Sequence, residues 1–241
     1  MRLYMIRWYI FLCILLVFLS CKREKEILSL HYNTSPFEYV KVEDALEIYL
    51  LEDSTFSIEV RANRDGVDQI KVEVIDSVLH ISDHRTNKWL KPKSNKVSVY
   101  ITSCSLKEVV AAEGCKTQTL SPITSNEFGI VFNGRVNEAD LELNCETFYY
   151  WNDHPCGGRL TLSGQTNRLK IWNFALVSVD AKNLLTNHAL VINDSKGDCE
   201  VTVLNSLEYS ITGVGNICLF GNPDEILADE VTSTGRLIQY E

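Results

Sequence analysis

The sequence has no excess of basic residues. Its 23 Lys and Arg stand against 32 Asp and Glu, which gives a formal net charge of −9. The first 20 residues contain Arg2 and Arg7 and no acid, so the net charge of the chain without them is −11. A protein that binds nucleic acid needs a basic face to displace the counterions of the phosphate backbone. We therefore expect no nucleic-acid partner.

The sequence also lacks the short motifs of common enzymes and cofactor sites. It has no GxSxG, HExxH or Walker loop, and no CxxC pair of the kind found in thioredoxin-like sites and zinc ribbons. Gly213-Val214-Gly215 lacks the third glycine of a dinucleotide-binding loop, and we interpret it as a tight turn. Asp194-Ser195 has no histidine near it in sequence, so a polar turn explains it better than a nucleophile does. We expect no catalytic residue, no bound metal and no cofactor.

Beyond the first 20 residues, no segment carries apolar residues at helical spacing over three turns. From Phe37 onward the apolar residues instead alternate with polar ones, which is typical of half-buried strands. The clearest of these segments are residues 40–42, 46–50, 56–60, 70–74, 79–81 and 97–101. The sequence therefore predicts an all-β body over residues 37–241.

One long apolar run is present near the N-terminus. Residues 8–19 are 12 consecutive apolar residues, which is short for a membrane span and fits the core of a signal peptide. Phe18-Leu19-Ser20-Cys21 follows, and it resembles the lipobox of bacterial lipoproteins, in which the cysteine receives diacylglycerol. An uncleaved anchor helix with an incidental cysteine is the alternative. Both interpretations place the body outside the cytoplasm.

These features predict a signal peptide over 1–20, a membrane anchor through a lipid on Cys21 and a charged and polar tether over 21–36. The charged residues 22–26 loosely resemble the signal that sends some lipoproteins to the surface of Gram-negative bacteria. Their mixed charge leaves periplasmic retention open. We expect an outer-membrane lipoprotein of the cell envelope that is either surface-exposed or periplasmic.

The predicted body contains six cysteines. An oxidising compartment permits disulfides, but a chain of this length can build its core without them. Several of the six lie within the alternating stretches, so we expect mostly small, buried packing residues. Cys145, His154 and Cys156, with the distant His188, match the ligand spacing of no common zinc site. The six cysteines are Cys104, Cys115, Cys145, Cys156, Cys199 and Cys218.

The second half of the chain shows a recurrence. Alternating stretches begin about every ten residues, and two of them per coil would give a rung of roughly twenty residues, which suits a solenoid. Asparagine follows the same spacing, since it tolerates the left-handed backbone of tight corners and can hydrogen-bond from rung to rung. The stretches begin near Leu141, Phe148, Leu160, Leu169, Val177, Ala189, Glu200, Glu208 and Ile217. The asparagines are Asn144, Asn152, Asn173, Asn183, Asn193, Asn205 and Asn216.

This recurrence favours a β-solenoid that resembles a single-stranded parallel β-helix, preceded by an N-terminal β-rich part. The alternative is an antiparallel β-sandwich with Asn-rich hairpins. Hairpin dipeptides of the DG and NG type are nearly confined to Asp65-Gly66 and Asn133-Gly134, which favours the solenoid.

Particular segments resemble a known family, the head GIN domain of putative autotransporter adhesins, which is common in exported proteins of Gram-negative bacteria. The resemblance covers residues 37–241 and is most specific near the C-terminus. It implies a β-helical head with an adhesive or surface-structural role, and it supplies no catalytic residues. The segments are residues 72–75, 79–81, 97–101, 106–109 with Gly114, 209–217, 220–223 and 234–235.

Aromatic residues on two neighbouring stretches predict a binding face. If Phe148, Tyr150, Leu169 and Ile171 point inward, their neighbours Tyr149, Trp151, Lys170, Trp172 and Phe174 point outward. Trp151 and Trp172 are 21 residues apart, close to one rung, so their indoles can stack on one face. Flat aromatic ridges suit sugar rings. We predict Tyr149, Trp151, Trp172 and Phe174 as the binding face; alternatively, these rings cover a seam or pack against the N-terminal strands.

Two functions therefore stand. The favoured one is a lipid-anchored, non-enzymatic surface protein that adheres to a glycan or cell-surface ligand through a face of the solenoid. The alternative is a polysaccharide-processing lyase or hydrolase whose carboxylates come from Asp153, Asp180, Asp194 and Asp198. A groove with convergent carboxylates and a basic residue would favour the enzyme, and a ridge of aromatic and polar residues would favour the adhesin.

Overall fold

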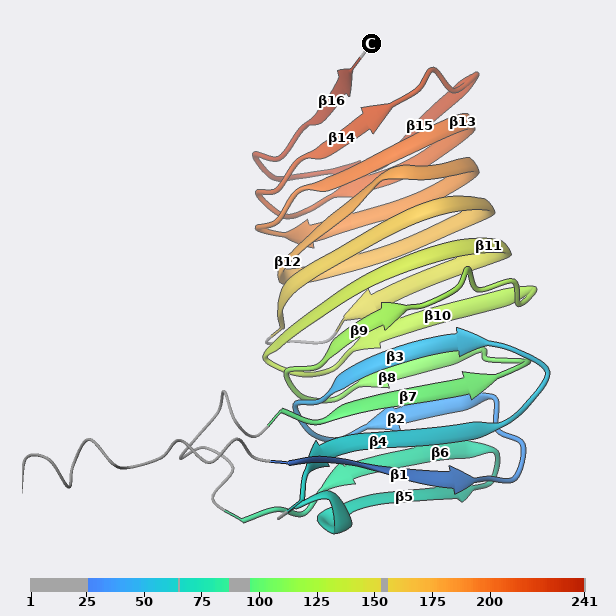
Figure 1. Cartoon of the computed structure of the whole chain (residues 1–241). Helices are drawn as coiled ribbons and strands as arrows, with labels where there is room; N and C mark the ends of the chain where they lie inside the picture. Colours follow the sequence, from blue (N-terminus) through green and yellow to red (C-terminus); the bar gives the residue numbers. More distant parts are fainter. Residues whose placement is uncertain (1–25, 65, 87–95, 153–155, 241) are drawn as a thin grey trace, which may run out of the picture.

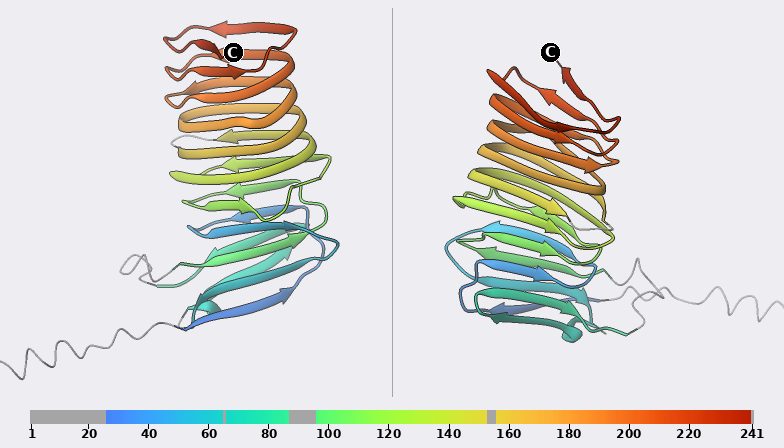
Figure 2. Two further views of the ribbon diagram at one scale, coloured as in Figure 1. Left: turned by 45° about the horizontal axis from the view of Figure 1, so that its top comes forward. Right: turned by 180° about the vertical axis from the view of Figure 1, so that it is seen from behind.

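The computed structural model describes residues 26–64, 66–86, 96–152 and 156–240. The predicted signal peptide and Cys21 lie outside these residues. The described chain is all-β, with sixteen strands in one winding sheet and a single 3-10 turn, η1 (Val67–Gln69). No helix within the described ranges is long and apolar enough to cross a membrane. Figures 1 and 2 show the strands stacked into a column.

The strands fall into an N-terminal and a C-terminal group. The first group is β1 (Ile27–Asn33), β2 (Tyr39–Val42), β3 (Glu47–Glu52), β4 (Ser57–Asn63), β5 (Ile70–Ile75), β6 (Val78–Asp83), β7 (Ser98–Ser103), β8 (Glu108–Ala111) and β9 (Lys116–Thr119). The second group is β10 (Glu127–Phe132), β11 (Val136–Asn152), β12 (Gly157–Ser195), β13 (Cys199–Ile211), β14 (Ile217–Phe220), β15 (Glu225–Val231) and β16 (Leu237–Tyr240).

The second group forms a parallel β-solenoid. β11 and β13 are long because each continues around one corner of its coil without a break, and β12 is longer still because it continues around both corners (Figure 1). β11 pairs in parallel with β12 at an offset of one rung, as in Leu141 with Leu162, and β12 pairs in parallel with β13, as in Val179 with Cys199. The predicted rung of roughly twenty residues and the solenoid are therefore confirmed, and the antiparallel sandwich is wrong.

Alternation explains why these residues wind into a column. In β11 almost every second side chain is buried, and the register places like residues over one another, such as Phe148 over Leu169 and Tyr150 over Ile171. All four side chains are buried in the interior. Burying one such side chain contributes roughly 1.5–3 kcal/mol, while the parallel ladder satisfies the backbone groups. The core is thus a set of apolar columns that run along the solenoid axis.

The N-terminal group builds its coils out of chain order. β2 lies between β6 and β8, and β3 lies between β7 and β9, with all these pairs parallel. The rung formed by β2 and β3 therefore lies between the rung of β6 and β7 on one side and the rung of β8 and β9 on the other. Antiparallel strands then close this end, since β4 pairs with β7, β1 with β4 and β5 with β6 (Figure 2). The predicted N-terminal β-rich part is a mixed, nearly closed sheet.

The described body begins earlier than residue 37. β1 pairs with β4 along its whole length, from Ile27 opposite Asn63 to Asn33 opposite Ser57. Leu28, Leu30 and Tyr32 pack against the core from alternate positions of β1. The sequence predicts a tether over 21–36, and in the structure residues 27–33 form this strand.

Buried asparagines stabilise the other corner, which at Asn173 lies within β12 and at Asn193 lies near the end of β12. Asn173 Nδ2 donates to Val177 O at 2.9 Å and lies 3.2 Å from Asn193 Oδ1 on the next coil, so the expected hydrogen bonding from rung to rung is confirmed. The expected left-handed backbone is wrong, because the described non-glycine residues with positive φ are Asp76, Ser77 and Ala175. Asparagine lies at these corners because its buried amide donates to backbone carbonyls of the turn, such as Val177 O and Gly197 O.

The body cysteines are free thiols. Cys115, Cys145, Cys156, Cys199 and Cys218 are buried and Cys104 is exposed, so the packing role is confirmed for five of the six. Burial raises the pKa of the Cys115 thiol to about 11 and that of Cys199 to about 12. These two thiols therefore stay protonated at neutral pH and are poor nucleophiles.

Candidate ligand-binding face

The predicted aromatic residues lie together on one lateral face of the solenoid. We call Tyr149, Trp151, Trp172 and Phe174 the aromatic face. Trp151 is 39% exposed and the other three side chains are half-buried, whereas their sequence neighbours Phe148, Tyr150, Leu169 and Ile171 are at most 1% exposed. The expected alternation of inward and outward side chains is therefore observed on both coils.

The two tryptophans form a column across neighbouring coils. Trp151 of β11 is the direct register partner of Trp172 of β12, and parallel strands lie about 4.8 Å apart. Val131 of β10 is the partner of Trp151 on its other side and is only 1% exposed. Trp151 and Trp172 thus give an apolar strip on the outside of two successive coils, and the side chain of Val131 beside this strip is covered.

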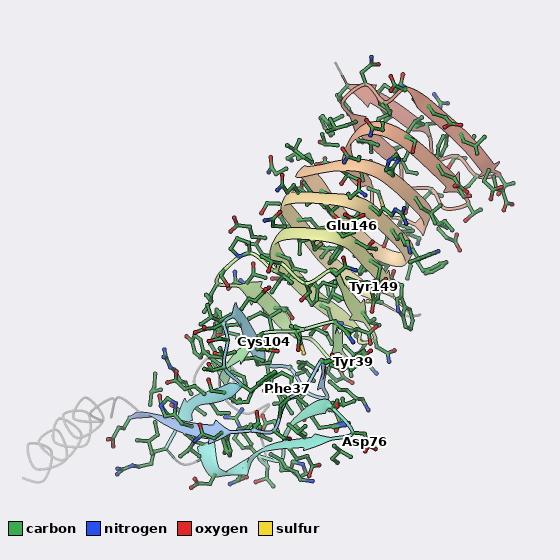
Figure 3. All side chains as sticks on the ribbon, turned by 90° about the vertical axis from the view of Figure 1, so that its right-hand side faces the viewer. Phe37, Tyr39, Asp76, Cys104, Glu146 and Tyr149 are labelled. Atoms are coloured by element: carbon green, nitrogen blue, oxygen red, sulfur yellow. The ribbon has the colours of Figure 1, made fainter. Side chains whose placement is uncertain are left out.

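Tyr149 occupies a neighbouring column and is held in place by a hydrogen bond. Its ring lies across Gly129 of β10, where a Cβ atom would come within 2.1 Å of the ring carbons, so only glycine leaves the space. Its hydroxyl donates to Glu108 Oε2 of β8 at 2.8 Å. Burial, followed by the hydrogen bond to Glu108, raises the pKa of Tyr149, which keeps the phenol protonated at neutral pH. The ring is therefore fixed before any ligand arrives. Tyr39 and Tyr149 are both visible on the side that Figure 3 faces.

Phe174 is anchored at the end of the aromatic face through its backbone. Its N–H donates to Asn152 Oδ1 at 2.8 Å, and Asn152 Nδ2 donates to the carbonyl of Phe174 at 2.7 Å. Ala175 follows with a φ of 62°, which turns the chain into the corner. The paired hydrogen bonds join two coils at this point and fix where β12 turns at Phe174.

The carboxylates considered for an enzyme have other partners. Asp180 accepts a hydrogen bond from Arg159 at 2.8 Å and lies 3.4 Å from Lys182 Nζ. Asp198 Oδ1 accepts from the backbone N–H and the side chain of Asn216. Asp194 is exposed, and Asp153 lies outside the described residues. Within the part of the chain that the structure describes, no three His, Cys, Asp or Glu side chains are placed to hold a metal ion.

The turns at Asp194-Ser195 and Gly213-Val214-Gly215 have structural roles. Ser195 is buried, and its hydroxyl donates to Val177 O at 2.9 Å on the preceding coil. Gly215 lies in the turn between β13 and β14, where a Cβ atom would come within 2.1 Å of the carbonyl oxygen of Gly197. Both features are tight corners between stacked coils.

A charged groove that sequence reasoning missed lies on another face. It has a volume of about 300 Å³ and includes Lys116, Glu138, Asp140 and Arg159. Lys116 pairs with Glu138 in register and Glu138 pairs with Arg159, so charges of opposite sign face one another from coil to coil. Such pairs favour one register. The signal in the sequence is the recurrence of charge at intervals of about one rung.

Comparisons with known proteins give a family and a fold. The family model described as "Putative auto-transporter adhesin, head GIN domain" matches residues 36–223. Among curated proteins, none matches this chain. A solved structure described as a putative adhesin from Bacteroides fragilis is similar over 90% of this chain and 98% of its own, with a TM-score of 0.77 and 16% identity.

Two solved structures from Parabacteroides distasonis are also similar. One is described as a putative adhesin, with a TM-score of 0.61 and 17% identity. The other is described as a putative lipid binding protein, with a TM-score of 0.62 and 15% identity. Each comparison covers 90% of this chain and 98% of the other. At these identities the similarity establishes the fold.

Proposed function

Because this chain belongs to the head GIN domain family of putative auto-transporter adhesins, we propose that it is a non-enzymatic, lipid-anchored adhesin of the cell surface that binds its ligand through the aromatic face. The family description concerns adhesion and names no reaction. The observation that carries the choice of face is the pairing of Trp151 with Trp172 on the outside of adjacent coils. Large aromatic side chains usually gain most by burial, so a row of them left outside favours an interaction surface.

The chemistry of the aromatic face suits a glycan. Indole faces bury the apolar C–H surface of a sugar ring, and polar groups beside them orient the hydroxyls. Lys170 is the register partner of Tyr149, and Glu108 accepts from the Tyr149 hydroxyl, so charged and apolar groups alternate next to the tryptophans. Binding to a preformed face of this kind costs little conformational entropy.

With a lipid on Cys21, the position of β1 would give the molecule a direction. Ile27 begins β1 six residues after Cys21, and six extended residues reach at most about 20 Å. A lipid on Cys21 would therefore hold the β1 end of the column next to the membrane, with the coils of the aromatic face farther away. A Cys21→Ala variant is expected to lose metabolic labelling by a fatty-acid probe. Labelling that persists in this variant would contradict the anchor.

The binding role is tested with the double variant Trp151→Ala and Trp172→Ala in the full chain displayed on cells. We expect adhesion to fall by about tenfold or more, as for central aromatic residues of an interface, with an unchanged melting temperature. Leu227→Ala is the matched control, because Leu227 is a 54% exposed apolar residue on β15 and its loss should leave adhesion unchanged. Unchanged adhesion, or a large fall in melting temperature, would show that the two rings serve packing instead.

One observation favours the polysaccharide-processing alternative, namely the charged groove that holds Glu138 and Asp140 beside Lys116 and Arg159. Glycosidases need two carboxyl groups near the scissile bond. Incubation of the protein with acidic polysaccharides, followed by an assay for new reducing ends, tests this alternative. We expect no product. Product that disappears in a Glu138→Gln variant would replace adhesion by catalysis as the function of this scaffold.

A further inference from the structure

A second surface lies at the corner of the solenoid where β11 bends at residues 144–146 and β12 bends at residues 165–167. We call it the amide trough. It has a volume of about 410 Å³, within the range of roughly 300–1,000 Å³ that ligand sites occupy. Figure 3 faces this corner and shows Glu146 and Tyr149 on the same side of the column. The trough is therefore close to the aromatic face and distinct from it.

Two ladders of amide side chains form the walls of the trough. On one wall, Gln165 Nε2 donates to Asn144 Oδ1 on the preceding coil at 2.7 Å. On the other wall, Asn187 Nδ2 donates to Asn167 Oδ1 at 3.0 Å, and Asn167 Nδ2 donates to Glu146 Oε1 at 2.6 Å. Each step advances one coil, so the amides repeat about every 4.8 Å along the axis. The hydrogen bonds within each ladder hold the side chains in one orientation.

The floor between the walls is buried. Cys145 and Thr166 are register partners that line the trough at 7% and 5% exposure, and Cys145 Sγ lies 3.7 Å from Thr166 Oγ1. Thr166 Oγ1 also lies 3.2 Å from the carbonyl oxygen of Arg168. The backbone of the floor is already used by the parallel ladder between β11 and β12. An added peptide strand could not pair with it, and the side chains carry the recognition.

The ladders leave hydrogen-bonding capacity free for a ligand. An amide has two N–H donors and an oxygen with two lone pairs, and each ladder step uses one N–H of its donor. The second N–H groups of Gln165 and Asn187, and further lone pairs of their oxygens, remain for groups in the trough. Sugar hydroxyls both donate and accept, so a row of them can bind a row of amides.

Two leucines add an apolar end to the trough. Leu185 is 52% exposed and Leu204 is 45% exposed. They lie where the pairing of β12 with β13 shifts in register between Ala181 and Leu185 and between Thr186 and His188. The irregular coil leaves these leucines outside, although each would gain by burial. They offer the apolar contact that the C–H face of a sugar ring needs.

The charge of the trough indicates an uncharged ligand. Glu146 is the carboxylate that lines it, and Glu146 accepts from Asn167. An acidic sugar would be repelled by Glu146, and the described residues that line the trough include no lysine or arginine to bind its carboxylate. We propose that the amide trough binds an uncharged oligosaccharide that lies along the solenoid axis. This inference rests on the proposed adhesive function and names its ligand class.

The test uses the full chain and an array of neutral glucan, mannan and galactan oligosaccharides, with polygalacturonate and gelatin peptides as further probes. The dissociation constant of the best neutral oligosaccharide is then measured for the double variant Gln165→Ala and Asn187→Ala. We expect binding to weaken about tenfold, as for two lost hydrogen bonds, at an unchanged melting temperature. Gln239→Ala is the matched control, since Gln239 is an exposed amide on β16 that should not affect binding.

A second variant keeps the test decisive if the double variant is unstable. Leu204→Gln preserves side-chain volume and removes the exposed apolar surface, so binding should weaken several-fold. If neither trough variant weakens binding while the Trp151→Ala and Trp172→Ala variant does, the trough is overturned and adhesion through the aromatic face stands. Equal binding of polygalacturonate, or binding of gelatin peptides in place of every glycan, overturns the ligand class. Adhesion of cells without any glycan binding does the same.

Discussion

The fit between Gly129 and Tyr149 shows how a single residue position shapes the aromatic face. Glycine at 129 lets the ring of Tyr149 cross β10 and reach Glu108 on β8. A side chain at this position would displace the ring or the strand, because a Cβ atom and the ring carbons cannot share the same space. The cost of a substitution at 129 therefore depends on whether the ring is present.

Gly129→Ala is expected to reduce the free energy of unfolding by about 1–3 kcal/mol in the wild-type chain, since it overpacks a filled space. In a Tyr149→Ala background the same change should cost less, with a coupling of about 1 kcal/mol between the two positions. Urea denaturation of the two single variants and the double variant measures this coupling. An equal cost of Gly129→Ala in both backgrounds would show that the ring does not lie over residue 129.

For single residues, the sequence predicts whether a side chain points inward or outward, but it does not predict which residues that side chain contacts. Period-two alternation was enough to place Trp151 and Trp172 outside and Tyr150 inside. It could not find Glu108 as the partner of Tyr149, because that contact depends on which strand lies two places away in the sheet. The amide trough was also missed, although Asn144 belonged to the recurrent asparagines. That its other residues are neighbours can be predicted only once the register between successive coils is known.

At the scale of the element, the corners of the coils depend on asparagine. Asn173 is fully buried, and its amide contacts Val177 O, Asn193 Oδ1 and Cys199 Sγ at 2.9, 3.2 and 3.3 Å. Asn183 follows the same spacing in sequence but is exposed. A comparison of Asn173 with Asn183 therefore distinguishes a structural role of the buried amide in the corner from a general preference for asparagine in turns.

Asn173→Ala is expected to reduce the free energy of unfolding by about 1–3 kcal/mol, because it removes a buried amide that donates to Val177 O and to Asn193 Oδ1, even though Ser195 Oγ still donates to Val177 O. Asn183→Ala should change it by no more than about 0.5 kcal/mol, as is usual for surface substitutions. Thermal or urea unfolding of the two variants provides the comparison. Equal effects at the two positions would contradict a structural role for the buried amide.

Six strands of the first half are predictable from alternation, whereas β1, β8, β9 and the arrangement of the strands are not. Alternation gave β2, β3, β4, β5, β6 and β7, which the structure confirms. Their spatial order depends on the β2–β3 rung being covered on one side by β6 and β7 and on the other by β8 and β9. Alternation of apolar and polar residues is the same in a strand that stacks on the preceding rung and in a strand that stacks on a rung much earlier in the chain. It therefore cannot predict the spatial order of the strands. The second half was easier because each coil there stacks on the one before it.

At the scale of the whole molecule, stability should vary along the column. In a solenoid each coil contacts its neighbours, so the free energy of local opening depends on how many neighbours a coil has. The coils of β11 and β12 are covered on both sides. Among the described strands, β15 pairs with β13 alone and β16 with β14 alone, and all seven residues of β15 are exposed.

We therefore expect a gradient in native-state hydrogen exchange. Amides of β15 and β16 should exchange first, and those of β11 and the first coil of β12 should exchange last, near the global free energy of unfolding. β14 is the internal control, because it lies between β13 and β16 and should be better protected than either terminal strand. β1 also has a single partner strand, but Leu28, Leu30 and Tyr32 pack against the core, so its amides should outlast those of β15. Exchange that is uniform along the column, or faster in β11 than in β15, would show that the coils unfold as one unit and that neighbour contacts do not set local stability.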